Sequence, residues 1–436
     1  MTPFASMWSD LSGVGRHGET GGYRRYAWTA EDATLREWFA GEAAARGLDL
    51  VEDRVGNQWA WWGDPDAHVR ETGEGGVVTG SHLDSVPDGG AFDGPLGVVS
   101  GFAALDALRA KGVRPTRPLA VANFVDEEGA RFGVACAGSR VLTGAMTAER
   151  ALALTDGDGV SMAEAFRSTG RDPGAYGADP EALRRVGAYV ELHVEQGQAL
   201  GDAERLTRLR LDGSAREAPR GEDAWGGAVA VGTSIHPHGR WRIDLPGVAN
   251  HAGTTALEDR SDAMLLAAEV TLAVREAARA HGCVATVGRV EVTPNGINAV
   301  PSHVRLWLDA RGPEESEVRR TVAQVEGRVA ELGGTLAEQS WTGPTPFTDD
   351  LTARVHGALR SGVGGGSGTV PLLSTGAGHD AGVLATAGVP AAMLFVRNPT
   401  GVSHSPAEHA EEADCLTGVE ALTAVLEDLV GDGEAS

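Results

Sequence analysis

The sequence predicts an α/β fold with a mostly parallel sheet, because short apolar runs alternate with helical segments and the runs end in polar residues. The run at 77–86 is followed by a helical pattern at 97–112 and by a second apolar run at 118–129. This order of strand, helix and strand indicates a parallel unit, since parallel strands need a crossover connection. Ligands of such sheets bind at the carboxyl ends of the strands. We therefore expect functional residues where these runs end.

The other elements of this domain show the same periodicities. Residues 29–45 read as an early helix, because Thr29 is a favourable N-cap and apolar side chains follow it at helical spacing. Residues 188–197 and 391–396 are short apolar runs of the kind that form buried strands. We expect both runs to join the sheet, with the polar end of 188–197 at the same edge as the other strand ends.

A different pattern begins near Gly239. From there, alternating strand segments, RWRIDLPG and HVRLWLDAR, accompany two amphipathic helical segments at 262–282 and 315–334. The length of 436 residues also favours two domains over one. Helix and strand signals resume at Leu351, so the α+β segment is inserted within the first domain. The predicted division is 1–236 with 344–436, and 237–343.

Composition and charge exclude several classes of protein. The formal net charge of −24 argues against nucleic acid or an anionic membrane as a partner, because both require basic surface. No apolar run approaches the about 20 residues of a membrane span, and the first residues lack the apolar stretch of a secretory signal. Cys136, Cys283 and Cys415 are too widely spaced for a disulfide framework or a thiolate zinc site. A cytoplasmic location is the default expectation.

The first polar cluster is GSHLDSVPDGGAFDGPLG at 80–97. His82 ends the predicted strand, Asp84 follows it closely, and Asp93 lies in a glycine-rich loop. Imidazole and carboxylate groups suit Zn²⁺, Mn²⁺ and similar ions, and Asp84 is close enough to orient the His82 ring. Taken alone, the motif is equally well read as a turn with ordinary polar caps.

The second cluster is DEEG at 126–129, where Glu127 and Glu128 stand side by side after an apolar run. Two unpaired carboxylates would be costly to bury, so a cation is expected nearby. Because adjacent residues at a strand end point in different directions, one glutamate can bind a metal while the other faces a water molecule. In isolation, such a motif is more often a solvated strand end.

Two further histidines follow strand signals, namely His193 in ELHVEQG and His404 in GVSHSPAEH. Either one alone would be an unremarkable polar residue. Together with His82, Asp93 and a glutamate of DEEG, they supply nitrogen and oxygen ligands from separate strand ends. Such a set fits two ions that share a bridging carboxylate and a water molecule. The combination therefore predicts a dinuclear metal site.

These motifs resemble those of the M20 metallopeptidase-like amidohydrolases, and within them the branch of N-carbamoyl-L-amino acid hydrolases, allantoate amidohydrolases and β-ureidopropionases. The resemblance covers nearly the whole chain. It implies a metallopeptidase-like α/β catalytic domain and an inserted α+β lid through which two copies form a homodimer. The matching segments are GGYRRYAWTAED (21–32), GSHLDSVPDGGAFDGPLG, DEEGARFG, ELHVEQG, GVANHAGTT (247–255), PNGINAVP (294–301), LDAR (308–311), GAGHDA (376–381) and GVSHSPAE.

Carried over to this chain, the family pattern implies two divalent metal ions and one general base. The implied ligands are Asp93 between the ions, His82 and His193 on one ion, and Glu128 and His404 on the other. Glu127 is then left as the base, and His379 joins Asp84 beside the ligands. Zn²⁺ is the expected metal, with Mn²⁺, Co²⁺ or Ni²⁺ as alternatives, because these ligands accept several divalent ions.

The resemblance also implies a small substrate that carries a carboxylate. Its expected contacts are Gln196 from the catalytic domain and His251, Asn298 and Arg311 from the lid. Arg311 can hold a carboxylate through two parallel hydrogen bonds, and His251 can stabilise an oxyanion. Without the resemblance, His251 and Asn298 would read as turn residues and Arg311 as a surface ion pair.

The expected reaction is hydrolysis of a linear C–N bond in a small N-substituted amino acid, such as an N-carbamoyl-L-amino acid or allantoate. N-formyl or N-formimidoyl amino acids are the first rival substrates. A dipeptidase or aminopeptidase is the second rival, and a non-catalytic binding protein is the third. A polar Gly- and Arg-rich stretch at about 202–226 reads as an insertion relative to the family, and its place near the lid bears on substrate identity.

Overall fold

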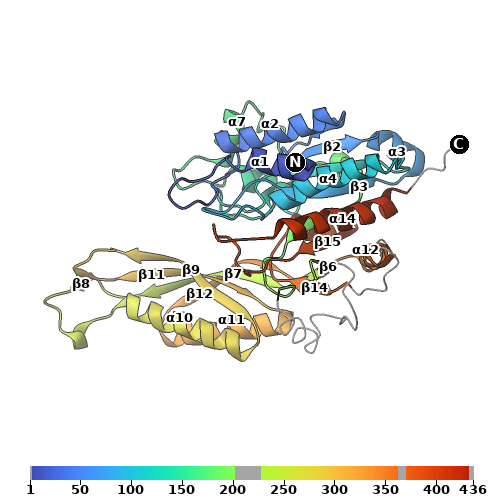
Figure 1. Ribbon diagram of the computed structural model, residues 1–436. Coiled ribbons are helices and arrows are strands. Elements are labelled where there is room, and N and C mark those ends of the chain that lie inside the picture. The colour runs from blue at the N-terminus through green and yellow to red at the C-terminus, as the bar shows by residue number, and fades with distance from the viewer. Residues whose placement is uncertain (1, 202–226, 362–369, 432–436) are drawn as a thin grey trace. The chain divides into compact units, whose positions relative to one another are not determined.

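The computed structural model describes residues 2–201, 227–361 and 370–431 (Figure 1). The chain forms two compact units. The first comprises Met1–Thr233, Pro346–Leu373 and Gly378–Ser436, and the second comprises Ser234–Thr345 and Ser374–Ala377. The sequence suggested boundaries at 236/237 and 343/344 and did not suggest the short return at Ser374–Ala377. The predicted insertion at 202–226 lies outside the described residues.

A mixed, mostly parallel sheet of nine strands organises the first unit. Its order is β1-β2-β4-β3-β5-β15-β6-β13, with β14 paired to β6. The pairs β4–β3, β3–β5 and β5–β15 are parallel, whereas β1–β2, β2–β4 and β15–β6 are antiparallel. The strands are β1 (Asp49–Glu52), β2 (Gln58–Trp62), β3 (Gly76–His82), β4 (Leu119–Phe124), β5 (Val186–Val194), β6 (Val229–Ile235), β13 (Thr345–Pro346), β14 (Leu372–Thr375) and β15 (Ala391–Val396).

The apolar runs of the sequence form the central strands, but the strands are shorter than expected. The run 77–86 yields a strand that ends at His82, and 118–129 yields one that ends at Phe124. Both strands are buried along their whole length, as parallel strands covered on both faces are. The polar residues beyond these ends lie in loops. The run 391–396 matches β15.

Helices flank this sheet. The expected early helix is α2, and the Thr29 hydroxyl caps it by accepting a hydrogen bond from the Asp32 amide. The helices of the first unit are α1 (Pro3–Leu11), α2 (Ala30–Ala45), α3 (Pro65–Thr72), α4 (Pro95–Ala110), α5 (Ala137–Leu142), α6 (Ala148–Leu152), α7 (Met162–Ser168), α8 (Pro180–Arg184), α12 (Asp349–Ser361), α13 (Asp380–Thr386) and α14 (Glu412–Val430).

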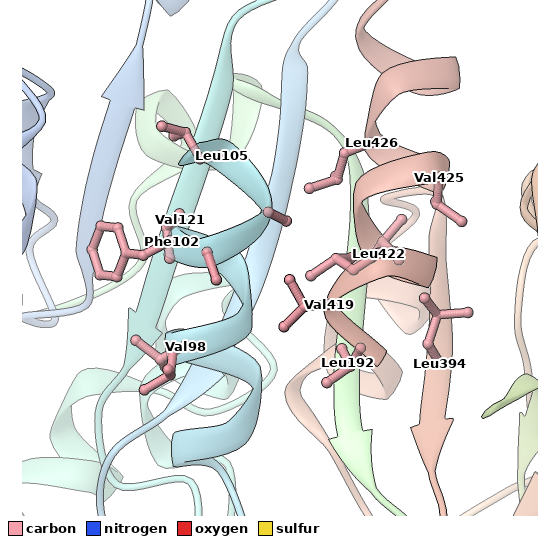
Figure 2. Close-up of a cluster of buried hydrophobic side chains, with 14 of the residues drawn as sticks. Val98, Phe102, Leu105, Val121, Leu192, Leu394, Val419, Leu422, Val425 and Leu426 are labelled. Carbon is pink, nitrogen blue, oxygen red and sulfur yellow. The ribbon is translucent and has the colours of Figure 1, made fainter. Parts of the chain in front are cut away.

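The main core lies where α4 and α14 pack together against the sheet (Figure 2). Phe102 of α4 and Leu422 of α14 are fully buried, and Leu192 of β5 and Leu394 of β15 extend the same cluster. This apolar packing holds the central parallel strands in place. It therefore fixes the positions of the strand ends, from which the site residues project.

The second unit is a four-stranded antiparallel sheet in the order β12-β7-β11-β9, and α10 and α11 pack against one face (Figure 1). Residues of β11 alternate between buried and half-buried, so that Val304, Leu306 and Leu308 face the helices. The elements are β7 (His238–Pro246), β8 (Asn250–His251), a 3₁₀ turn (Leu257–Asp259), α10 (Ala263–Ala280), β9 (Val284–Thr293), β10 (Ala299–Val300), β11 (His303–Arg311), α11 (Glu315–Glu331) and β12 (Thr335–Thr342). No helix among the described residues is both long and apolar enough to cross a membrane.

Candidate metal centre

The carboxyl ends of the four parallel strands deliver acidic and imidazole side chains to one edge of the sheet. His82 is the last residue of β3, and its register partner on β4 is Phe124, the residue at which that strand ends. His193 lies one residue before the end of β5, in register with Phe395 of β15. The loop that follows β15 carries His404. The sequence placed ligands at strand ends, and the strand register brings those ends together.

Asp93 stands at the centre of this cluster. Its Oδ1 is 3.2 Å from His193 Nε2 and 3.6 Å from His82 Nε2. Its Oδ2 is 3.5 Å from His404 Nε2, which is in turn 3.6 Å from Glu128 Oε2. One carboxylate oxygen therefore faces two imidazoles, and the other faces an imidazole beside a second carboxylate. Asp93 therefore takes part in two groups whose geometry could hold a metal ion, one with His82 and His193 and one with Glu128 and His404.

Each of the two buried rings has one nitrogen engaged by the protein and one directed at Asp93. His82 Nδ1 lies 3.1 Å from the Asp84 carbonyl oxygen, and His193 Nδ1 lies 2.8 Å from the Val194 carbonyl oxygen. These contacts favour the Nδ1–H tautomer and leave the Nε2 lone pair available. Within the described part of the chain, both Nε2 atoms are buried and make no hydrogen bond. Buried acceptors normally have a partner, so these two atoms are suited to bind a cation.

Tight backbone geometry brings the ligand loops close. Gly94 has φ +85°, and a Cβ atom there would lie 2.4 Å from Cε1 of His82. His404 and Asp126 adopt the left-handed backbone region, with φ +54° and +55°. Such conformations cost a residue with a side chain of order 1–3 kcal/mol and persist where surrounding contacts impose them.

Asp84 organises the two glutamates of DEEG. Its two carboxylate oxygens accept hydrogen bonds from the backbone amides of Glu127 and Glu128, at 3.2 and 3.1 Å. Its Oδ1 also lies 3.4 Å from His82 Nδ1. The sequence predicted that Asp84 orients His82, and the structure places it against the ring and against the backbone of both glutamates.

Glu127 and Glu128 occupy different surroundings although they are neighbours. Glu128 Oε2 faces His404, whereas Glu127 Oε2 lies 3.9 Å from His82 Nε2. The other oxygen of Glu127 accepts a hydrogen bond from the Cys136 thiol at 3.3 Å. Burial, followed by the charge of nearby carboxylates, raises the pKa of both glutamates well above the ordinary value. A cation bound at this site would lower both pKa values again.

Neighbouring charges raise the pKa values of His82 and His193 and lower that of Asp93. Burial favours the neutral ring of His82, but the carboxylates of Asp84 and Asp93 outweigh it and raise the pKa of His82 well above its usual value. The pKa of His193 is raised by Asp93 in the same way. Burial alone would raise the pKa of Asp93, yet the two imidazoles hold it well below its ordinary range.

Three further polar residues, Gln196, Glu408 and Glu191, lie around the cluster. Gln196, expected to contact substrate, donates from Nε2 to Asp93 Oδ2 at 2.7 Å. Glu408, which the sequence did not single out, accepts from the backbone amides of Phe92 and Asp93. Burial, then the charge of Asp93, raises the pKa of Glu408 to about 7. Glu191 is buried behind the site and accepts hydrogen bonds from the Ser81 hydroxyl and the Ala381 amide.

His379 lies beside His193. Its ring centroid is 4.5 Å from that of His193, and its Nε2 is buried without a hydrogen bond among the described residues. Together with Glu191 and His193 it forms a further group with metal-binding geometry. Burial and the nearby imidazoles hold the pKa of His379 well below its usual value, so the ring is neutral.

The remaining predicted contacts belong to the second unit. His251 on β8 pairs with Ala299 on β10, and the Asn298 carbonyl oxygen accepts from the Ala252 amide, so His251 and Asn298 share one exposed ribbon. His251 Nδ1 accepts from the Gly253 amide at 3.0 Å, which leaves Nε2 as the proton donor.

Arg311, at the end of β11, pairs through Nε and Nη2 with both oxygens of Asp309, and its Nη1 donates to the Gly376 carbonyl. Burial by itself would lower the pKa of Arg311, but Asp309 raises it, so the guanidinium stays charged. A substrate carboxylate at Arg311 would therefore share the guanidinium with Asp309.

Comparison with known proteins shows where the chain belongs. The model of Peptidase family M20/M25/M40 matches residues 78–428. The N-carbamoyl-L-amino acid amidohydrolase of Geobacillus stearothermophilus is 36% identical over 435 residues, which cover 95% of this chain and 96% of that protein. The ureidoglycolate hydrolase of Arabidopsis thaliana is 30% identical, covering 92% of this chain and 81% of that protein.

The fold agrees with these sequence matches. The crystal structure of a hydantoinase/carbamoylase family amidase from Burkholderia vietnamiensis superposes with a TM-score of 0.81 at 29% identity, covering 98% of this chain and 97% of that one. The match extends over both units and over the strand ends that carry the cluster around Asp93. The chain therefore belongs to Peptidase family M20/M25/M40 and, within it, to the amidohydrolases of the hydantoinase/carbamoylase group.

Proposed function

We propose that this protein hydrolyses a linear C–N bond in small N-substituted amino acids, with N-carbamoyl-L-amino acids as the main candidates. The observation that carries the proposal is the cluster around Asp93, in which buried His82 Nε2 and His193 Nε2 face one carboxylate oxygen and His404 faces the other. The similarity to an N-carbamoyl-L-amino acid amidohydrolase over 95% of the chain supports this substrate class.

The donor set suits two divalent cations, with Zn²⁺ favoured and Mn²⁺, Co²⁺ or Ni²⁺ as alternatives. His82 and His193 would hold one ion, Glu128 and His404 would hold the other, and Asp93 would contact both. Bound ions would make a shared water molecule acidic and would polarise the scissile carbonyl group. The buried Nε2 atoms without hydrogen bonds and the raised pKa of Glu128 fit this assignment.

Glu127 is proposed as the general base. Its Oε1 is held by the Cys136 thiol, so Oε2, on the side of His82, is the oxygen that would accept the proton of the attacking water. Glu127 would then release this proton to the leaving nitrogen. Burial keeps bulk water away from the transferred proton.

Four residues are proposed as substrate contacts. The Arg311 guanidinium would bind the substrate carboxylate, and the Nε2–H of His251 would donate to the developing oxyanion. Asn298 would hydrogen-bond to the substrate, and Gln196, whose Oε1 is buried without a partner among the described residues, would accept from a substrate N–H.

We also propose that the second unit forms a homodimer. Strand β9 lies at the edge of its sheet and presents ten residues, and such an edge invites pairing with another chain. Exposed apolar side chains surround this edge, including Leu265 and Leu272 on α10 and Val290 on β9. A groove with a volume of about 370 Å³, lined by Met264, Leu272 and Val290 among others, runs between them. A second copy would cover this apolar surface.

A second candidate substrate class is the ureido compounds related to allantoate and ureidoglycolate. The similarity to a plant ureidoglycolate hydrolase over 92% of the chain favours it. These compounds also place a planar ureido carbon near a carboxylate, so the same residues would serve. N-formyl and N-formimidoyl amino acids remain further alternatives, as do dipeptides.

A substrate panel tests the proposal. Purified protein is stripped with a chelator, reconstituted with Zn²⁺, Mn²⁺, Co²⁺ or Ni²⁺, and supplied with N-carbamoyl, N-formyl and N-formimidoyl amino acids, allantoate, ureidoglycolate and dipeptides. We expect metal-dependent ammonia release from N-carbamoyl-L-amino acids above that from all others. Peptide cleavage without ammonia release from ureido substrates would overturn the proposed substrate class.

A further inference from the structure

One buried glutamate, Glu408, connects the loop that carries Asp93 with the loop that carries His404. Glu408 lies in the loop after β15, close in sequence to His404, and its side chain is 5% exposed. Its Oε1 accepts hydrogen bonds from the backbone amides of Phe92 and Asp93, at 2.9 and 3.0 Å. A single carboxylate oxygen therefore holds the backbone from which the Asp93 side chain projects.

The other oxygen of Glu408 reaches the same cluster through a hydroxyl group. Oε2 lies 3.4 Å from Ser403 Oγ, and Ser403 Oγ lies 3.3 Å from Asp93 Oδ2. Because Ser403 immediately precedes His404, the contact ties the His404 loop to the Asp93 side chain as well as to its backbone. Glu408 thus couples the positions of Asp93 and His404.

The loop before Asp93 is folded tightly around this carboxylate. A Cβ atom at Gly90 would lie 2.4 Å from Glu408 Oε1, so the close approach is possible because residue 90 is a glycine. Phe92 packs against Trp8 and His409, which holds the loop from its other side. Glu408 therefore has a defined partner set and is not a solvated acid in a surface loop.

We propose that Glu408 is a positioning residue for the metal centre, and this inference rests on the proposed function. It acts through Asp93 and His404 by fixing the distance between their loops. His82 and His193 are held independently, because both belong to strands of the central sheet. Loss of Glu408 should therefore weaken metal binding unequally. The ion that Asp93, Glu128 and His404 would hold should lose more affinity than the ion at His82 and His193.

Two substitutions distinguish a role of the Glu408 hydrogen bonds from a role of its negative charge. Glu408→Ala removes the acceptor and leaves two buried amides without their partner. Glu408→Gln removes the negative charge but keeps a carbonyl oxygen that can accept from both amides. If Glu408 acts by positioning, the glutamine variant retains the effect. If it acted through its charge, both variants would behave alike.

Asp179→Ala provides a matched control. Asp179 is also buried, at 8% exposed, and its carboxylate also accepts two backbone amides, those of Arg54 and Ala182. The variant therefore reproduces the loss of a buried acceptor elsewhere in the same unit. It measures how far general destabilisation alone affects metal binding.

Chelator competition and metal content per chain are measured for wild type and for the three variants. We expect Glu408→Ala to bind one of its two ions about 10- to 100-fold more weakly, as loss of an outer contact to a metal ligand usually does. Glu408→Gln should stay within about threefold of wild type, and Asp179→Ala should keep both affinities. Equal affinities in Glu408→Ala and wild type, equal losses in both Glu408 variants, or an equal loss in Asp179→Ala would each overturn the inference.

The two proposals fail in different ways. A wild-type protein that binds no ion overturns the metal centre and the role of Glu408 together. A wild-type protein that binds two ions, with an alanine variant that binds them equally well, overturns the role of Glu408 alone.

Discussion

Two adjacent carboxylates at the end of β4 hold different positions because their partners differ. The Asp84 carboxylate fixes the backbone amides of both, after which Glu128 turns to His404 and Glu127 turns to Cys136 and His82. The sequence predicted that the two side chains diverge, since neighbouring residues at a strand end point in different directions. It did not identify the Cys136 thiol, because a widely spaced cysteine gives no signal of a hydrogen-bond partner.

Metal affinity should rise with pH. In the metal-free protein, the carboxylates around the two rings raise the pKa of His82 and of His193 above the ordinary value despite their burial. Divalent ions bind the neutral imidazole, so each ring must lose its proton first. Below the raised pKa values protons compete with the metal, and above them this competition is lost.

Chelator competition at about pH 6 and pH 8 measures this effect. We expect the dissociation constant to fall about tenfold per pH unit for each proton released. Calorimetry in buffers of different ionisation enthalpy should also detect the released protons. An affinity that is independent of pH would show that both rings are already neutral in the metal-free protein.

Arg311→Met should impair substrate binding more than turnover. The guanidinium can share its charge between Asp309 and a substrate carboxylate, whereas methionine can bind neither. We expect KM for carboxylate substrates to rise about 10- to 100-fold with a smaller change in kcat, which is the pattern of a group that binds ground state and transition state alike. Arg240→Met is the matched control, because Arg240 also contacts Asp309 but is not among the proposed substrate contacts. Equal kinetic changes in both variants would argue against a specific role for Arg311.

At the scale of elements, periodicity predicted the central strands and their polar ends. It did not predict which strands lie next to each other in the sheet. The order β4-β3-β5-β15 depends on packing between segments far apart in the chain, and hydrophobic periodicity does not encode such pairing. Glu408 illustrates the same limit within the site. In the sequence it is one acid in a polar loop, and it becomes recognisable only when Phe92 and Asp93 are seen beside it.

The packing of α14 on α4 should contribute strongly to stability. Leu422 is fully buried between these helices and the sheet (Figure 2). We expect Leu422→Ala to lower the free energy of unfolding by about 2–5 kcal/mol, because it removes apolar contacts and leaves a cavity. Leu50→Ala, at a leucine that is 41% exposed, should cost less than about 0.5 kcal/mol. Denaturant titration of both variants checks this, and equal losses would contradict the assigned core.

The edge of the second unit should determine oligomeric state. Leu272→Asp places a charge in the apolar groove beside β9, and we expect it to convert a dimer to a monomer. Leu257→Asp is the control, since Leu257 is more exposed but does not line that groove. Light scattering at matched concentrations measures the mass of each. A wild-type monomer, or a Leu272→Asp dimer of unchanged affinity, would overturn the proposed dimer.

At the scale of the whole molecule, residues from very distant parts of the sequence form one cluster with the geometry to hold metal ions. The parallel strand ends explain why His82, the DEEG glutamates and His193 could be predicted together, since such ends share one edge of the sheet. The roles that distinguish ligand from base came from the family resemblance instead. Gln196 came from the same route as an implied substrate contact, and in the structure its Nε2 donates to Asp93 Oδ2.

The proposed mechanism requires that Glu127 transfers protons at a centre of two divalent ions without binding either ion. The Glu127→Gln variant separates these roles, because it keeps the size and a hydrogen-bonding group but cannot accept the proton. Metal content per chain and kcat for an N-carbamoyl-L-amino acid are measured on the same reconstituted sample. We predict two ions per chain in both proteins and a loss of about 10²- to 10⁴-fold in kcat for the variant. Near-normal turnover in Glu127→Gln, or a wild-type protein that binds fewer than two ions at full activity, would contradict the claim.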